Sequence, residues 1–261
     1  MDYRAYYRSN VTYVEHDDER LDTIVDIVAR RRPAATLDIG CGTGWLARRL
    51  GDASGTAVTG VDVLPAVLAE GWTYVVADVT RRLPFAAGSF DCVVAGEIIE
   101  HVPDPDAVLE ELYRVTTPGG TLVVSTPNMV SWANRLLVPM GIQPLGTETS
   151  SVVALGRRLR VLGQGNRVQG HLKVFTHRAL GEILDRYGFE VTERHGMPAE
   201  FPFPVSLVDR FFTRFVPLSS DLLFVANRRA SHRPPDAPAQ YVATQRRWRS
   251  RPVRRSRSER S

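Results

Sequence analysis

Hydrophobic positions along the first part of the chain follow two spacings, one typical of helices and one typical of buried strands. Apolar residues recur at i, i+3, i+4 and i+7 from Leu21 to Val28, which predicts an amphipathic helix over residues 17–31. An apolar strand, ATLDI at 35–39, runs through GCGTG at 40–44 into the helical stretch WLARRL. A strand, a glycine turn and a helix in this order are typical of nucleotide-binding α/β folds.

Further apolar runs alternate with helical segments along the rest of the chain. They predict strands at residues 56–63, 73–79, 91–97 and 120–127 with helices between them, then a helix at 177–187 and strands at 188–194 and 222–228. Apolar strands that alternate with helices predict a parallel sheet with right-handed crossovers. We therefore expect one α/β domain over residues 1–228, with a Rossmann-like, seven-stranded and mostly parallel sheet. A less regular segment at 128–170 is expected to be a lid insertion.

Composition and charge set the C-terminal end apart. The chain is 43% hydrophobic and 24% charged, as in ordinary globular proteins. Residues 228–261 hold eleven arginines against Asp236 and Glu259, a net charge of +9, whereas the rest of the chain carries −5. Pro, Ser and Arg dominate this end without apolar periodicity, so we expect residues 229–261 to be a disordered Arg-rich tail. Contact with nucleic acid is expected only through this tail, because an RNA-binding domain needs a basic groove.

Several features bear on the compartment. No stretch has the ~20 unbroken apolar residues that a membrane helix needs. The first residues, MDYRAYYRSN, carry charges and aromatic rings where a secretory signal would have an apolar core. Two cysteines, Cys41 and Cys92, are too few for a disulfide framework. We therefore expect a cytoplasmic protein.

The glycine-rich turn differs from the dinucleotide-binding fingerprint. Gly40, Gly42 and Gly44 are separated by single residues, whereas that fingerprint is G-x-G-x-x-G. A pyrophosphate favours helix N-terminal amides with no carboxylate beside them. Asp38, however, ends the strand two residues before the first glycine. The turn therefore favours a ligand with a cationic end.

Two more aspartates end the next two predicted strands. Asp62 closes the second strand, where a carboxylate can accept hydrogen bonds from both hydroxyls of a ribose. Asp78 closes the third strand, where it can accept from an adenine amino group. A nucleoside that carries a positive charge and no phosphate is S-adenosylmethionine, which we expect as the cofactor.

Four motifs together resemble the class I S-adenosylmethionine-dependent methyltransferases. They are LDIGCGTG, GVDV, VVADVTRRLPFAAGSFDCVVAGEIIEHV and LEELYRVTTPGGTLVVSTPN, in the family's order, and the resemblance covers about residues 20–228. It implies that the glycine turn lines the methionine moiety, that the ends of the next two strands hold the ribose and the adenine, and that the fourth strand flanks the sulfonium. The residues are, in that order, Gly40, Cys41, Gly42 and Gly44; Asp62 and Val63; Asp78 and Val79; and Gly96.

Three candidate catalytic residues follow the fourth strand. Glu97, Glu100 and His101 are spaced i, i+3, i+4, which puts them on one side of a short turn at the edge where open α/β sheets bind ligands. Two carboxylates and an imidazole can form a divalent metal site. They can equally form a general-base cluster in which His101 and Glu100 are catalytic, or serve only to shape the site.

A distal histidine strengthens the metal interpretation. E-x-x-E-H followed by the lone histidine of GHLKVFT resembles metal-assisted O-methyltransferases. Those that methylate ubiquinone precursors carry the first three residues, and the small-RNA 2′-O-methyltransferases add the distal histidine. The resemblance implies that Glu97, Glu100, His101 and His171 bind Mg²⁺ or another divalent metal. The alternative is that His101 acts alone as a general base.

The sequence indicates only the chemical class of the methyl acceptor. Residues 128–170 lie where this superfamily often places an acceptor-binding insertion, and Trp132 with the arginines of this segment suits an anionic or lipid-linked small molecule. We expect methyl transfer to an oxygen of a glycan, a lipid-linked sugar or a secondary metabolite. The alternatives are a metal-dependent RNA 2′-O-methyltransferase and a non-catalytic protein that binds S-adenosylmethionine.

One more helix is predicted near the C-terminal end, with a strongly apolar face. Its apolar residues fall at i, i+1, i+4, i+5 and i+8, namely Leu207, Val208, Phe211, Phe212 and Phe215. We expect this face to be buried against the sheet or against a dimer partner. Peripheral docking on a membrane is the alternative. The oligomeric state does not follow from the sequence.

Overall fold

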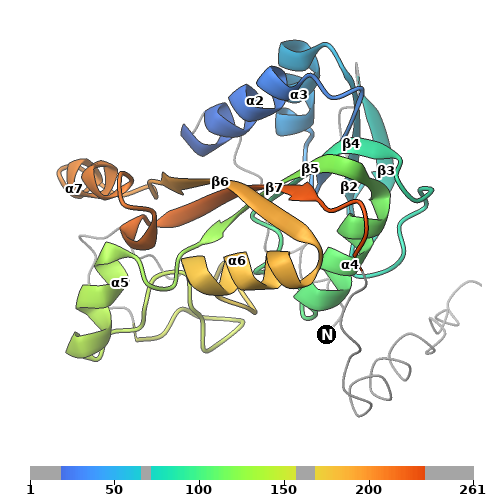
Figure 1. Ribbon diagram of the computed structural model, residues 1–261. Helices are drawn as coiled ribbons and strands as arrows, with labels where there is room; N and C mark the ends of the chain where they lie inside the picture. The colour runs from blue at the N-terminus through green and yellow to red at the C-terminus, as the bar shows by residue number, and fades with distance from the viewer. Residues whose placement is uncertain (1–18, 66–71, 157–167, 233–261) are drawn as a thin grey trace, which may run out of the picture.

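A seven-stranded sheet lies at the centre of the protein, in the order β3-β2-β1-β4-β5-β7-β6 (Figure 1). The computed structural model describes residues 19–65, 72–156 and 168–232. The strands are β1 (Ala35–Ile39), β2 (Ala57–Asp62), β3 (Thr73–Val76), β4 (Phe90–Gly96), β5 (Thr116–Pro127), β6 (Phe189–Met197) and β7 (Asp221–Arg228). The helices are α2 (Glu19–Arg31), α3 (Trp45–Ser54), α4 (Pro105–Val115), α5 (Trp132–Leu137), η1 (Val138–Met140), α6 (His177–Arg186), α7 (Val205–Phe212) and η3 (Val216–Leu218).

The direction of the strands confirms the predicted Rossmann-like fold class. Neighbouring strands from β3 to β5 pair in parallel, whereas β7 is antiparallel to both β5 and β6. Because parallel strands end at the same edge of a sheet, the carboxyl ends of β1, β2 and β4 lie side by side. The candidate residues on these three strands are therefore brought to one edge.

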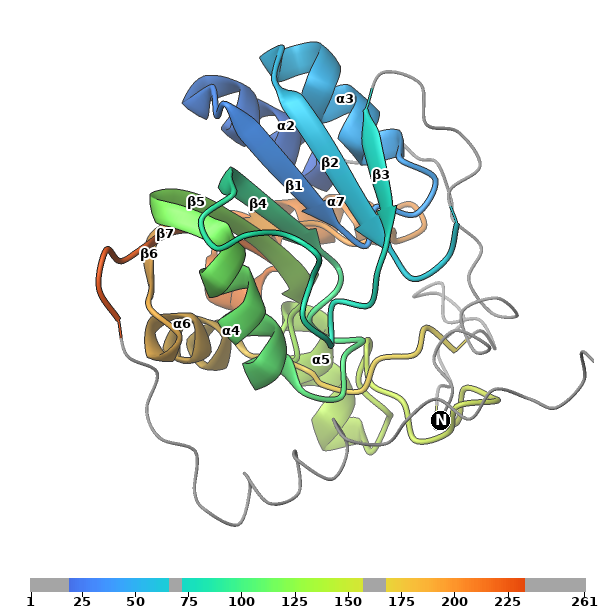
Figure 2. The ribbon, with the colours of Figure 1, turned by 90° about the vertical axis from the view of Figure 1, so that its right-hand side faces the viewer.

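Helices cover both faces of the sheet, as Figure 2 shows, and apolar side chains fill the space between them and the strands. One core layer packs α2 and α3 against strand residues such as Val58, Cys92 and Val94. The other packs α4 and α6 against residues such as Leu37 and Val93. Successive residues of β4 thus point to opposite faces, and both are fully buried, which is why the central strands are apolar throughout.

The predicted helix between the third and fourth strands is wrong. Residues 77–89 form turns and irregular backbone. Asp78 turns the chain directly after β3, because its Oδ1 accepts hydrogen bonds from the backbone N and the hydroxyl of Thr80 (3.0 and 2.6 Å). Pro84 and Gly88, the latter with φ of 66°, interrupt any helix farther along.

A fully buried carboxylate, that of Asp209, fixes the orientation of α7. It accepts hydrogen bonds from Trp132 Nε1 (2.6 Å), Ala199 N (2.7 Å) and Ser220 Oγ (2.5 Å). The ring of Trp132 also stacks on Phe212, with ring centroids 5.4 Å apart. Trp132 therefore joins α5 to α7 by packing, rather than offering a free wall for an acceptor.

The expected burial of the α7 face against the sheet is also wrong. Because Asp209 holds the polar side of the helix inward, four of the five apolar residues point outward, and they are about half exposed: Leu207, Val208, Phe211 and Phe215. Only Phe212 turns toward Trp132.

Some predictions lie outside the described residues. These are the first two residues of the helix predicted at 17–31, residues 66–71 between the second and third predicted strands, residues 157–167 of the 128–170 insertion with most of its arginines, and the Arg-rich tail from residue 233 onward. Among the helices of the described part, none combines the length and the apolar character that crossing a membrane requires.

Removing the Asp209 carboxylate should destabilise the protein. Asp209→Ala leaves three buried or half-buried donors without their acceptor, so we expect the free energy of unfolding to fall by about 3 kcal/mol or more. Urea unfolding followed by circular dichroism measures this loss. Asp52→Ala, at a side chain that is 77% exposed, is the control and should change stability by less than about 0.5 kcal/mol. Equal midpoints for the two variants would contradict the anchoring role.

Candidate active site

The glycine turn between β1 and α3 requires residues without side chains. Gly40 and Gly44 have φ of 71° and 88°, in the left-handed region that favours glycine. A Cβ at Gly40 would lie 2.1 Å from Ile98 Cδ1, and one at Gly44 would lie 1.9 Å from the ring of Trp72. The turn therefore packs between Ile98, which follows β4, and the ring of Trp72. The sequence analysis did not assign Trp72 to this site.

The Asp62 carboxylate at the end of β2 holds this turn in place. Its Oδ2 accepts a hydrogen bond from Gly42 N (3.0 Å), and its Oδ1 accepts from Leu64 N (2.9 Å). The side chain is buried. Asp62 thus lies directly against the predicted cofactor turn, with Val63 half-buried beside it.

Asp38 is a buried carboxyl without a counter-charge. It is 2% exposed, and its Oδ2 has no hydrogen-bond partner among the described residues. Burial, and secondly the charge of Asp62, raise the pKa of Asp38 to about 8. The same causes, with Asp38 added, raise the pKa of the Cys41 thiol, which makes a reactive thiolate unfavourable. A cation placed beside Asp38 would lower its pKa again.

Asp78 and Val79 lie just beyond β3, which ends at Val76 rather than at residue 79. The Asp78 Oδ1 is engaged by Thr80, and its Oδ2 lies 3.5 Å from Arg81 Nε. Ala77 N donates to Asp62 O (2.9 Å), so the ends of β2 and β3 are tied together. Asp38, Asp62 and Asp78 therefore come from three adjacent strand ends, as expected.

Glu97 lies beside Glu100 and helps to raise its pKa, but its own carboxylate is engaged by two further partners. It follows Gly96 at the end of β4, with φ of 53°, a left-handed conformation that is rare outside glycine. Its Oε1 accepts from Ser125 Oγ (2.9 Å) and pairs with Arg20 Nη1 (3.0 Å). Arg20 comes from the first turn of α2, and no local pattern in the sequence predicts its place at this edge.

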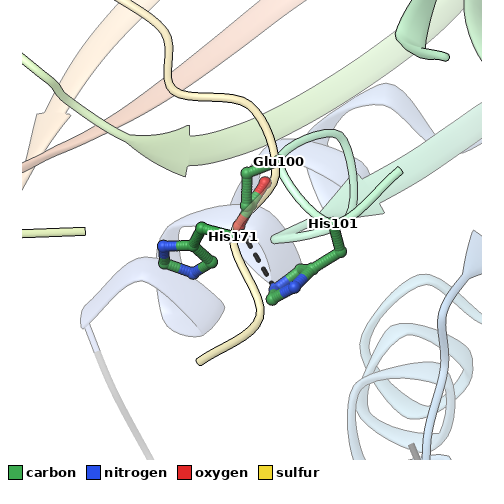
Figure 3. Close-up of side chains that lie close together, drawn as sticks. All are labelled: Glu100, His101 and His171. Atoms are coloured by element: carbon green, nitrogen blue, oxygen red, sulfur yellow. Dashed lines mark ion pairs between the residues drawn. The ribbon is translucent and has the colours of Figure 1, made fainter. Parts of the chain in front are cut away.

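Glu100, His101 and His171 converge on one point, as Figure 3 shows. One potential ligand atom from each lies within 4.8 Å of the other two. The rings of His101 and His171 have centroids 4.8 Å apart, and His101 Nε2 lies 3.8 Å from Glu100 Oε1. The structure therefore brings together three of the four predicted ligands.

Backbone contacts dock the segment that carries His171. Leu172 N and Lys173 N both donate to Glu100 O (2.7 and 3.0 Å). The Glu148 carboxylate accepts from Gly170 N (2.8 Å). Glu148 was missed by sequence reasoning, because its partners are backbone groups more than 20 residues away.

The hydrogen bonds of the two imidazoles fix their tautomers. His101 Nδ1 faces Gly170 O (3.3 Å), and His171 Nδ1 faces Gly146 O (2.8 Å). A carbonyl oxygen only accepts, so each Nδ1 carries the proton and each Nε2 keeps a lone pair. Backbone carbonyls orient metal-binding histidines in the same manner.

Burial disfavours the charged forms of Glu100 and His101. Glu100 is 1% exposed, and its Oε1 has no hydrogen-bond partner among the described residues, whereas Oε2 accepts from Thr126 Oγ1 (3.0 Å). Burial, and then Glu97, raise the pKa of Glu100 well above its usual range. Burial, and then His171, lower the pKa of His101 to about 4. A carboxyl group and two imidazoles therefore face one another, a donor set that can bind a divalent metal.

Comparisons with known proteins agree on one family. A family model described as a methyltransferase domain matches residues 13–194. The chain is 32% identical over 131 residues to a malonyl-[acyl-carrier protein] O-methyltransferase of Erwinia billingiae, covering 47% of this chain and 52% of the relative. It is 36% identical over 124 residues to a ubiquinone biosynthesis O-methyltransferase of Xanthomonas axonopodis pv. citri, covering 43% and 52%. The chain thus spans about half the length of the curated relatives it matches.

Solved structures share the fold. A methyltransferase dependent on S-adenosylmethionine from Methanosarcina mazei has a TM-score of 0.52 at 21% identity, covering 76% of this chain and 93% of that chain. The 1,6-didemethyltoxoflavin-N1-methyltransferase of Burkholderia thailandensis has a TM-score of 0.50 at 17% identity, covering 82% and 80%. At these identities the likeness concerns the fold alone.

The raised pKa of Asp38 makes a testable prediction about stability. Its pKa in the folded state, about 8, exceeds the ordinary value of 3.8 for this side chain. The folded state therefore binds more protons between these values, and the protein should lose stability as the pH rises from about 4 to about 8. Asp38→Asn removes this titration, so its melting temperature should fall less over the same range. Asp52→Asn is the surface control, and an identical pH dependence in Asp38→Asn and the unmutated protein would show that Asp38 is ionised throughout.

Proposed function

We propose that this chain, which belongs to the class I S-adenosylmethionine-dependent methyltransferases, transfers the methyl group of S-adenosylmethionine to an oxygen of a small-molecule acceptor. Family membership rests on the methyltransferase-domain match over residues 13–194 and on the seven-stranded fold. The observation that supports the transfer to oxygen is the buried cluster of Glu100, His101 and His171 beside the glycine turn. Such a cluster can take up the proton of an acceptor hydroxyl.

Three carboxyl groups support the choice of cofactor. S-adenosylmethionine supplies a methyl group on a positively charged sulfur. Asp38 fits a cationic group, because one of its oxygens is buried and has no hydrogen-bond partner within the described part of the chain. Asp62 would hold the ribose, and its hydrogen bonds to Gly42 and Leu64 already fix its position. Asp78 is assigned to the adenine.

We further propose that Glu100, His101 and His171 hold a divalent cation. The fit rests on the unpartnered Glu100 Oε1 and on two imidazoles whose Nε2 atoms keep lone pairs. A bound cation would lower the pKa of the acceptor hydroxyl and orient its oxygen. Two nitrogen ligands favour a borderline metal over Mg²⁺. Glu97 is not included, because Arg20 and Ser125 engage it.

The alternative is that His101 alone acts as the general base, without a metal. Its low pKa keeps the imidazole neutral at physiological pH, so its Nε2 is ready to accept a proton. Glu100 would then stay protonated, and His171 would serve only to position the ring of His101. The two mechanisms use the same atoms but differ in their response to a chelator.

The names of two relatives support oxygen as the methylated atom. They are a malonyl-[acyl-carrier protein] O-methyltransferase and a ubiquinone biosynthesis O-methyltransferase. For this chain we propose an oxygen of a glycan, a lipid-linked sugar or a secondary metabolite. RNA is less favoured as the acceptor, since residues 1–227 carry a net charge of −5 and RNA binding requires a basic surface.

Tritium transfer into a cell lysate tests the proposed function. The purified protein and methyl-labelled S-adenosylmethionine are incubated with lysate, which is then separated into lipid, metabolite, RNA and protein pools. We expect label in the lipid or metabolite pool, and loss of that label with Asp62→Ala. Label confined to RNA would favour the 2′-O-methyltransferase alternative, and no transfer to any pool would contradict methyl transfer.

A chelator and two histidine variants separate the metal from the general base. If the cluster holds a cation, we expect chelation to abolish transfer, and His101→Ala and His171→Ala each to reduce the rate by about 100-fold or more. The double variant should be scarcely worse than either, because the residues act as a unit. His195→Ala is the matched control, since His195 lies on β6 and pairs with Glu193.

Binding of S-adenosylhomocysteine, measured on the same variants, should be unchanged, because the cofactor contacts lie on other strand ends. Full transfer in the presence of chelator, with an inactive His101→Ala protein, would refute the metal and keep the base.

A further inference from the structure

Helix α7 and its flanks expose an unusual amount of apolar surface. Five large side chains on residues 203–215 are between 45% and 78% exposed, namely Phe203, Leu207, Val208, Phe211 and Phe215. Single exposed apolar residues are normal on proteins, but a contiguous group marks a surface that contacts something else. Burying this group would remove several aromatic rings from water.

A second exposed apolar group lies on α5 and η1, beside the first. It consists of Leu136, Val138 and Met140, which are 53% to 64% exposed. Trp132 joins the two elements, because its ring stacks on Phe212 and its Nε1 donates to Asp209. Figure 1 shows α5 and α7 at the same end of the molecule. We call the exposed residues of both groups the α5–α7 surface.

The α5–α7 surface lies at the edge of the sheet that carries the candidate active site. Helix α5 begins five residues after β5 ends at Pro127, and Pro127 pairs with Asp221 at the start of β7. The carboxyl end of β4, which leads to Glu97 and Glu100, pairs with β5 at Gly96 and Ser125. A molecule held on this surface is therefore on the side of the protein where the acceptor must enter.

Charge decides what kind of partner fits. Residues 129–147 and 201–220 contain three exposed arginines, Arg135, Arg210 and Arg214, and their single carboxylate, Asp209, is fully buried. Within the described part of the chain, Arg210 forms an ion pair with Glu19 of α2, and Arg214 lies over the ring of Phe211. Apolar side chains rimmed by arginines are the pattern of a helix that lies in the headgroup region of an anionic bilayer.

We propose that the α5–α7 surface docks the protein on an anionic lipid bilayer, with Leu207 and Phe211 inserted at the level of the headgroups. A second copy of the chain fits less well, because a two-fold contact would bring six of these arginines together without an exposed carboxylate from the same segments. The docking does not require methyl transfer. It would give the active site direct access to an acceptor that resides in the membrane.

Vesicle flotation of the full chain tests the proposal. The vesicles contain equal parts of phosphatidylglycerol and phosphatidylcholine, or phosphatidylcholine alone. We expect the unmutated protein to float with the anionic vesicles, and Leu207→Glu/Phe211→Glu to lower its partition by at least about tenfold, because charges replace two exposed apolar side chains that would insert into the bilayer. Arg135→Gln/Arg214→Gln should lower it by a smaller factor that vanishes at high salt.

Val152→Glu/Leu155→Glu is the matched control, since both residues are exposed apolar side chains outside the α5–α7 surface. It should float like the unmutated protein. All variants keep the Arg-rich C-terminal end, so adhesion through that end is the same in each. Equal flotation of the Leu207→Glu/Phe211→Glu variant would overturn the proposal. So would a lipid-free dimer that this variant dissociates, or equally strong binding to pure phosphatidylcholine.

Discussion

The candidate active site depends on the close contact of Gly40 with Ile98. These residues follow β1 and β4, which are neighbours in the sheet, and a Cβ on Gly40 would lie 2.1 Å from Ile98 Cδ1. The contact presses the glycine turn against the turn that carries Glu97, Glu100 and His101. The proposed site for a cationic nucleoside is thereby placed beside the cluster proposed to take up a proton, because two parallel strands end at the same edge.

Two buried carboxyl groups near this contact lower the stability of the folded protein. Asp38 and Glu100 each have an oxygen without a hydrogen-bond partner among the described residues, and burial raises the pKa of both. Such groups lower the stability of the folded protein unless a ligand compensates them. Their presence at adjacent strand ends is therefore better explained by binding than by packing. Asp209 is the contrasting case, since three donors satisfy its carboxylate.

Periodicity predicted the strands and the main helices well, because a buried strand or an amphipathic helix leaves a local pattern. The strand-end positions of Asp38 and Asp62 followed from the same pattern. Long-range partners leave no such signal, so the pairing of Arg20 with Glu97 was not predicted. The apolar face at Leu207 predicted a helix correctly, but periodicity cannot tell whether a neighbouring element covers it. The helix predicted before β4 does not form, because turn-forming residues such as Asp78 occupy this segment. The alternation of strands and helices gives no sign of such turns.

Calorimetric titration of the purified protein with S-adenosylhomocysteine and with NAD tests the central claim most directly, because it needs no acceptor. The claim is that the strand ends around Asp62 form a site for a nucleoside with a cationic or amino-acid end. We expect micromolar binding of S-adenosylhomocysteine, little binding of NAD, and a loss of about 1–3 kcal/mol in Asp62→Ala. Tighter binding of NAD, or an affinity for S-adenosylhomocysteine that Asp62→Ala leaves unchanged, would contradict it.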